Sequence, residues 1–99
     1  MDYRPSGPEF FNNVGETRSK TIFEYVGDKE YTATIKKVEF TNSSQTLFTN
    51  LRFSGDTVYV TSQKYGSGYS ESIRVTCTLK YSNVGKESSC TFGCYPPQQ

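Results

Sequence analysis

The stretch that decides the fold is ESIRVTCTLKY, residues 71–81. From Ile73 to Tyr81 every second side chain is apolar or aromatic, and Arg, Thr and Lys fill the positions between them. Successive side chains of a β-strand point to opposite faces of the sheet. The pattern therefore predicts a long strand with one face in a hydrophobic core and the other in water.

The rest of the chain repeats this alternation in shorter pieces. Breaks rich in Gly, Asn and Ser separate strands that we predict at residues 21–26, 30–41, 46–53, 57–61 and 86–92. Within 30–41 the apolar phase shifts after Ile35, which predicts a bulge at Lys36-Lys37. With 8 Tyr and 7 Phe, the composition also favours strands.

About six to seven strands with no helix between them predict an all-β fold. We expect a small antiparallel β-sandwich of immunoglobulin-like character, with a barrel as the alternative. The chain contains no Trp, so the Cys–Trp–Cys signature of immunoglobulin domains is missing.

The 99 residues are enough for one domain. Residues 1–16 are rich in Pro, Gly and Asn and predict a flexible N-terminal arm, followed by a β-domain at 17–95 and a tail at 96–99. Phe10 and Phe11 are the apolar pair in the arm. We expect them to pack onto the edge of the domain; a partner-binding or strand-swapping arm is the alternative.

The three cysteines are Cys77, Cys90 and Cys94. A hairpin turning at Asn83-Val84 would place Cys77 opposite or beside Cys90, which predicts a Cys77–Cys90 disulfide worth about 2–3 kcal/mol. A Cys77–Cys94 bridge is the competitor. The remaining cysteine is an inert thiol, or joins two copies as a homodimer, or serves a metal; without any His we expect no metal. This pattern favours a secreted or extracellular protein, with a cytoplasmic one as the alternative.

The sequence lacks the residues that several classes of enzyme and binding protein require. The absence of His excludes Ser–His–Asp and Cys–His catalysis within the chain, and no phosphate-binding loop is present. We expect the carboxylates to be mostly solvated charges at outward strand positions: Glu24, Glu39, Asp56, Glu71 and Glu87. We therefore predict no enzyme and no cofactor. A net charge of +1 with dispersed Lys and Arg argues against nucleic acid, and no apolar run is long enough for membrane insertion.

The loop at residues 65–70 is the predicted binding site, because Tyr, Ser and Gly are typical of adaptable recognition loops. Its candidate residues are Tyr65, Ser67 and Tyr69, with Tyr59 one strand back; the alternative is that Tyr69 covers the core. Asn42-Ser43-Ser44 fits the N-glycosylation pattern.

The expected function is that of a secreted or surface-displayed, non-catalytic binding module that recognises a protein as an effector, inhibitor or adhesive domain. A structural or self-assembly subunit, viral or appendage-like, and a carbohydrate-binding domain are the alternatives.

Overall fold

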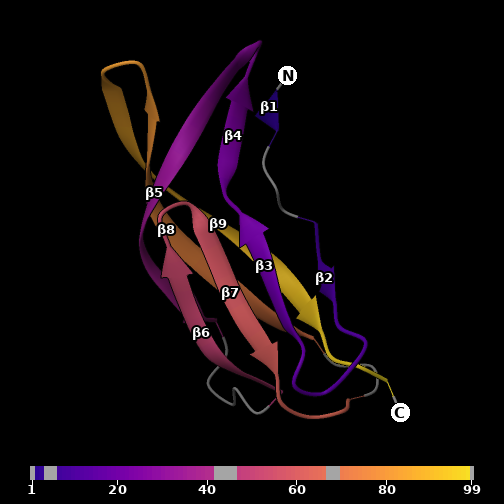
Figure 1. Ribbon diagram of the computed structural model, residues 1–99. Helices are drawn as coiled ribbons and strands as arrows, with labels where there is room; N and C mark the ends of the chain where they lie inside the picture. Colours follow the sequence, from indigo (N-terminus) through magenta and orange to yellow (C-terminus); the bar gives the residue numbers. More distant parts are fainter. Residues whose placement is uncertain (1, 4–6, 42–46, 67–69, 99) are drawn as a thin grey trace.

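The computed structural model describes residues 2–3, 7–41, 47–66 and 70–98 and contains two facing β-sheets (Figure 1). The strands are β1 (Asp2–Tyr3), β2 (Glu9–Phe10), β3 (Thr17–Thr21), β4 (Phe23–Val26), β5 (Lys29–Phe40), β6 (Phe48–Ser54), β7 (Thr57–Ser62), β8 (Glu71–Tyr81) and β9 (Val84–Tyr95). The larger sheet has the order β1-β4-β5-β8-β9-β2 and the smaller sheet the order β3-β7-β6. The all-β sandwich is confirmed, and the barrel alternative is wrong because the sheets do not close on each other.

Strand β8 lies at the centre of the larger sheet, between β5 and β9. Its alternation is confirmed: Ile73 and Val75 are 0% exposed, whereas Arg74 is exposed. The predicted bulge is confirmed as well, since the β5–β8 register shifts between Ile35 and Lys37. One face of the sheet is therefore dry along most of its central strand β8.

The smaller sheet covers that dry face, in front of the long strands in Figure 1. Alternate residues of β7 point inward, and Val58 and Val60 are 1% and 2% exposed. The buried core comprises Phe11, Ile22, Ala33, Ile35, Phe48, Val58, Val60, Ile73, Val75, Cys77, Leu79, Phe92 and Cys94. Both sheets and the N-terminal segment contribute to it. The immunoglobulin-like character stays a prediction.

The strand predicted at residues 21–26 is wrong as a single element. The chain leaves β3 in the smaller sheet and enters β4 in the larger one, and Ile22 occupies the crossing. Ile22 is 2% exposed, and its backbone N–H donates to the Asp56 carbonyl at 2.8 Å. Ile22 and Glu24 are both buried whereas Phe23 and Tyr25 are not, so inward and outward side chains still alternate across the switch, and the sequence pattern did not reveal it.

Both ends of the chain contact the sandwich. Strand β1 pairs antiparallel with β4, and β2 pairs in parallel with the end of β9. Near the other end, Pro96 and Pro97 are buried, and the Gly66 N–H donates to the Pro97 carbonyl at 3.1 Å. A Cβ on Gly66 would lie 2.8 Å from Pro96 Cγ, so this close approach needs glycine. The segment predicted as an arm, residues 1–16, thus includes β1 and β2.

Replacing Ile73 by Ala is expected to lower the free energy of unfolding by about 2–5 kcal/mol, because it leaves a cavity between the two sheets. Urea denaturation followed by circular dichroism measures the change. Thr91→Ala is the control: Thr91 is exposed opposite Arg74, and its loss should cost no more than about 1 kcal/mol. Equal losses for the two variants would contradict the assignment of the dry face.

Candidate functional site: an aromatic groove at the sheet edge

The predicted tyrosine site is only partly described. Tyr59 lies on the outward face of β7, where the Arg52 guanidinium carbon is 5.3 Å from its ring centroid. Tyr65 follows β7 and is 49% exposed. Ser67 and Tyr69 lie outside the described residues, as does the glycosylation pattern at 42–44. The structure therefore brings Tyr59 together with Arg52, a pairing that the sequence pattern did not indicate.

A second group of exposed aromatic residues lies where β2 runs beside the end of β9. The rings of Phe10 and Tyr95 stack with centroids 4.9 Å apart and an interplanar angle of 11°. Phe10 is 59% exposed and Tyr95 is 40% exposed. Large apolar side chains in water are unfavourable by roughly 1.5–3 kcal/mol each relative to burial. A pair of them in contact is thus a feature that needs an explanation.

These two rings belong to a groove of about 540 Å³. Its lining residues are Phe10, Phe11, Asn12, Tyr95, Pro96 and Gln98. None of the six carries a charge, and the amides of Asn12 and Gln98 are its polar side chains. The Gln98 amide nitrogen donates to the Pro96 carbonyl at 3.1 Å. The groove therefore combines apolar surface with a few neutral hydrogen-bonding groups, as ligand sites commonly do.

Strand alternation explains why Phe10 faces outward. Phe11 points into the core, where it is 4% exposed and its ring lies 5.1 Å from that of Phe48. Glu9 points to the same side as Phe11, toward β3 of the smaller sheet. Phe10 lies between them in the sequence, so its side chain must take the opposite face. The adjacent Phe10-Phe11 pair was the signal in the sequence that one of the two rings had to be exposed.

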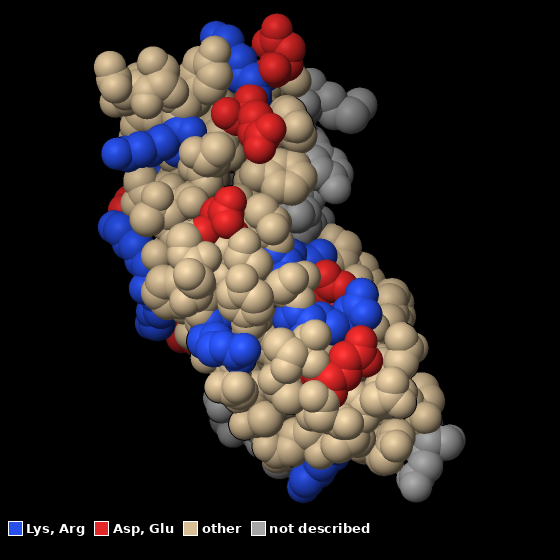
Figure 2. Space-filling model, in the orientation of Figure 1, with Lys and Arg blue, Asp and Glu red and all other residues tan. Residues whose placement is uncertain are grey.

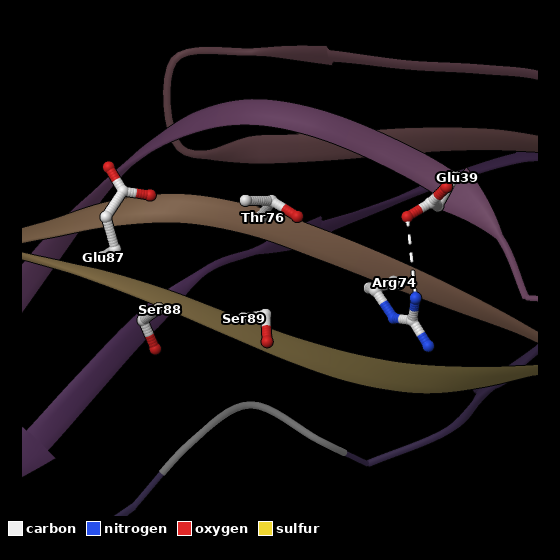
Figure 3. A pocket seen from close by; sticks show the side chains of 6 residues that line it. All are labelled: Glu39, Arg74, Thr76, Glu87, Ser88 and Ser89. Carbon is white, nitrogen blue, oxygen red and sulfur yellow. Dashed lines mark ion pairs between the residues drawn. The ribbon is translucent and has the colours of Figure 1, made fainter.

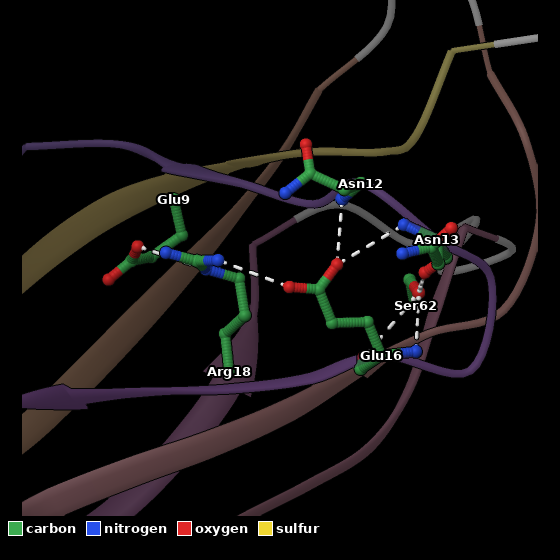
Figure 4. A network of polar contacts seen from close by, with 6 residues as sticks. All are labelled: Glu9, Asn12, Asn13, Glu16, Arg18 and Ser62. Carbon is green, nitrogen blue, oxygen red and sulfur yellow. Dashed lines mark hydrogen bonds and ion pairs between the residues drawn. The ribbon is translucent and has the colours of Figure 1, made fainter.

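Charged residues of β3 hold β2 in place (Figure 4). Arg18 Nε lies 3.5 Å from Glu9 Oε2, and Lys20 Nζ lies 3.6 Å from Glu9 Oε1. Lys20 Nζ also donates to the Gly7 carbonyl at 2.6 Å. Both cations come from the edge of the smaller sheet and reach the edge of the larger one. We call this set of contacts the edge clamp: Glu9, Arg18 and Lys20 across the open side of the sandwich.

The loop after β2 is fixed by Glu16, as Figure 4 shows. Glu16 Oε1 accepts hydrogen bonds from the backbone N–H groups of Asn12 at 2.7 Å and Asn13 at 3.2 Å. Its Oε2 accepts from Arg18 Nη1 at 3.1 Å. The Asn12 bond, with help from Arg18 and Asn13, holds the pKa of the Glu16 carboxyl below its usual value. Glu16 thus joins the loop, the edge clamp and the groove.

A polar hollow lies on the outer face of β5, β8 and β9 (Figure 3). Its lining residues are Glu39, Arg74, Thr76, Glu87, Ser88 and Ser89. Arg74 Nη1 lies 3.8 Å from a Glu39 carboxylate oxygen, and Glu87 is ion-paired with Lys36. Each carboxylate here already has a cation beside it, so the hollow offers little unbalanced charge to a ligand.

Two of the carboxylates expected at outward positions are buried instead. Glu24 is 3% exposed, and its Oε2 lies 3.3 Å from Lys86 Nζ of β9. Glu71 is 4% exposed and accepts the Leu47 N–H at 3.3 Å. For these two residues the expectation of solvated charge was wrong.

The predicted Cys77–Cys90 disulfide is wrong. The β8–β9 hairpin turns at Ser82-Asn83, with Ser82 at φ 59° and Tyr81 paired with Val84. This register puts Cys77 opposite Ser88, and no two of the three cysteines are close enough to bond. The described residues also contain no cluster of ligands suited to a metal ion.

Surface charge is mixed over the face seen in Figure 2. Blue and red side chains are intermingled there, and the lower part of that face is largely uncharged. The net charge is +1. In the part of the chain that the structure describes, no helix is long and apolar enough to cross a membrane.

Glu16→Gln is expected to flatten the acid side of the stability profile. A carboxyl whose pKa is lowered on folding stabilises the protein above its ordinary pKa of 4.5, and this contribution disappears as the pH falls through the lowered value. The variant should be less stable than the wild type at pH 7 and converge with it in acid. Urea midpoints measured across this range test the prediction. A difference that stays constant with pH would contradict it.

The three thiols should titrate completely in denaturant without a reducing agent. In the native protein at pH 8, Cys90 should react first, because Cys77 and Cys94 are buried. Burial raises the pKa of the Cys94 thiol to about 12, which leaves roughly one molecule in 10⁴ as thiolate. Alkylation followed by peptide mass spectrometry reports the order. Fewer than three modified cysteines after unfolding would indicate a disulfide and contradict the prediction.

No model of a known protein family, no curated protein and no solved structure matches this chain. The observations that bear on function are therefore the groove, its two exposed rings and its uncharged lining.

Proposed function

We propose that this protein is a non-catalytic binding module that recognises a protein partner through the aromatic groove. The observation that carries the proposal is the stacked pair of Phe10 and Tyr95, exposed by 59% and 40%. Tyr and other aromatic residues are enriched at the centres of protein interfaces, where a partner covers them fully. Covering the pair would recover much of the apolar burial that the monomer leaves unused.

The setting of the rings supports recognition. Phe10 lies on β2 and Tyr95 ends β9, and the hydrogen bond from the Phe11 N–H to the Tyr95 carbonyl helps to hold the two strands together. The edge clamp ties β2 to the smaller sheet through Glu9. Side chains on such a framework lose little freedom when a partner binds, and this favours affinity.

Carbohydrate binding is the second candidate, because aromatic rings beside the amides of Asn12 and Gln98 also suit a neutral sugar. A self-assembly subunit remains the third. A secreted or surface-displayed location stays a prediction, and the disulfide that favoured it is not formed.

Site-specific crosslinking tests the protein-binding proposal. With a photoreactive benzoylphenylalanine in place of Phe10, irradiation in an extract of the source organism should yield a discrete adduct with another protein. Tyr95→Ala in the same protein should reduce the adduct at least about fivefold, since losing one ring of an interface centre costs roughly 1–2 kcal/mol.

The matched control carries the same photoreactive residue in place of Tyr81, which is also 40% exposed but lies at the other end of β8. Equal labelling from positions 10 and 81 would contradict a specific site. An adduct only with a second copy of the chain would support self-assembly, and binding on a glycan array that Tyr95→Ala abolishes would support the carbohydrate alternative.

A further inference from the structure

We propose that the groove receives a short, extended, uncharged peptide segment of the partner, one residue of which pairs with the backbone of Phe10 at the outer edge of β2. This inference rests on the proposed function and adds to it the chemistry and the docking mode of the partner. The juxtaposition that carries it is an unpaired strand edge directly beside the aromatic groove.

The backbone N–H and C=O groups of Phe10 point away from the sheet. Strand β2 is the last strand of the larger sheet, and nothing is drawn beyond its outer side in Figure 1. The Phe11 N–H donates to the Tyr95 carbonyl at 3.1 Å, so residue 11 faces β9. Backbone groups alternate along a strand, which turns the N–H and C=O of Phe10 outward. Within the described residues these two groups have no hydrogen-bond partner.

The two neighbours of this residue limit how much chain can pair. Pro8 has no N–H to donate. On the other side, the Asn12 N–H is already given to the Glu16 carboxylate at 2.7 Å. Phe10 is therefore the position that offers both a donor and an acceptor. Such an edge suits one short extended segment and opposes continuous strand pairing between copies.

The lining of the groove fixes the chemistry of that segment. An extended peptide that pairs with Phe10 lies along the outer side of β2, so the side chain that it turns toward the groove lies beside the ring of Phe10, which stacks on Tyr95. No lining residue is charged, so a Lys or Glu in the segment would lose hydration without gaining an ion partner. The amides of Asn12 and Gln98 can bond to the peptide backbone or to a neutral side chain. An uncharged segment is thus favoured over an acidic or basic one.

Nuclear magnetic resonance of the full chain with peptide pools tests the inference. The probe is an equimolar pool of acetylated, amidated hexapeptides built from Thr, Val, Tyr and Gln. A second pool carries Lys or Glu at alternate positions. The uncharged pool should shift the Phe10 and Tyr95 amide signals. At nine-tenths occupancy it should slow hydrogen exchange at Phe10 about tenfold, because only the unbound tenth exchanges.

Three variants of the experiment separate the contribution of backbone hydrogen bonds from that of the aromatic rings. N-methylation of alternate amides in the uncharged pool should weaken binding, since it removes donors from the peptide. Tyr95→Ala should weaken binding at least about fivefold. Tyr81→Ala, at the same exposure but outside the groove, should leave it unchanged. The spectrum of each variant reports whether the protein is folded.

Four results would overturn the inference. They are no shift with the uncharged pool at millimolar concentration, equal binding of the charged pool, binding without protection of the Phe10 amide, and protection that appears in the free protein as its concentration rises. If crosslinking from position 10 still gives a partner protein, the proposed function stands and only this docking mode fails. If crosslinking fails while the peptides bind as expected, the docking mode stands without a natural partner.

Discussion

The alternation of side chains along a β-strand governs both the core and the groove. In β8 it sends Ile73 and Val75 to the interior and Arg74 to water. At the end of β2 the same rule leaves Phe10 outside and turns the next residue, Phe11, inward. Because a shift of one residue would exchange the two faces, neither arrangement can change by a small adjustment. The exposed ring is therefore a direct consequence of burying its neighbour.

Two kinds of interaction compete to explain why β2 stays on the sandwich. The ion pairs of Glu9 with Arg18 and Lys20 span 3.5–3.6 Å and are partly exposed, and such pairs contribute about 0–1 kcal/mol. Burial of the Phe11 ring contributes roughly 1.5–3 kcal/mol. Apolar burial therefore dominates, and the edge clamp mainly sets the position of the strand. Burying Phe11 keeps β2 on the sandwich but leaves the Phe10 ring in water. A partner that covers this ring would remove that unfavourable exposure.

Local patterns in the sequence were enough for the sandwich, the long central strand and the bulge at Lys36-Lys37, because each depends on neighbouring residues. Features that depend on distant ones could not be predicted. The chain crosses between the two sheets at Ile22 without interrupting the alternation of inward and outward side chains, so this alternation does not reveal the crossing. The turn lies at Ser82-Asn83, one residue before the predicted turn at Asn83-Val84. This shifts the pairing of β8 with β9 by two residues, so that Cys77 lies opposite Ser88 and is separated from Cys90.

The candidate site was missed for the same reason. Phe10 and Tyr95 lie at opposite ends of the chain and meet only because β2 pairs in parallel with β9. Sequence alone could show two adjacent aromatic residues in a polar segment, but not which ring is exposed or what lies beside it. The prediction of Tyr59 rested on residue type, and its contact with Arg52 was likewise a product of cross-strand pairing.

The dependence of the groove on both chain ends couples recognition to local stability. Strand β2 is two residues long, so the sheet hydrogen bonds that hold it are few. Short segments at a sheet edge open at lower free energy than a core strand such as β8. When β2 leaves β9, the Phe10–Tyr95 stack is lost and the groove with it. A partner that binds only when β2 is paired with β9 therefore stabilises that pairing by mass action. The affinity of the groove thus depends on the packing of Phe11, which holds β2 in place.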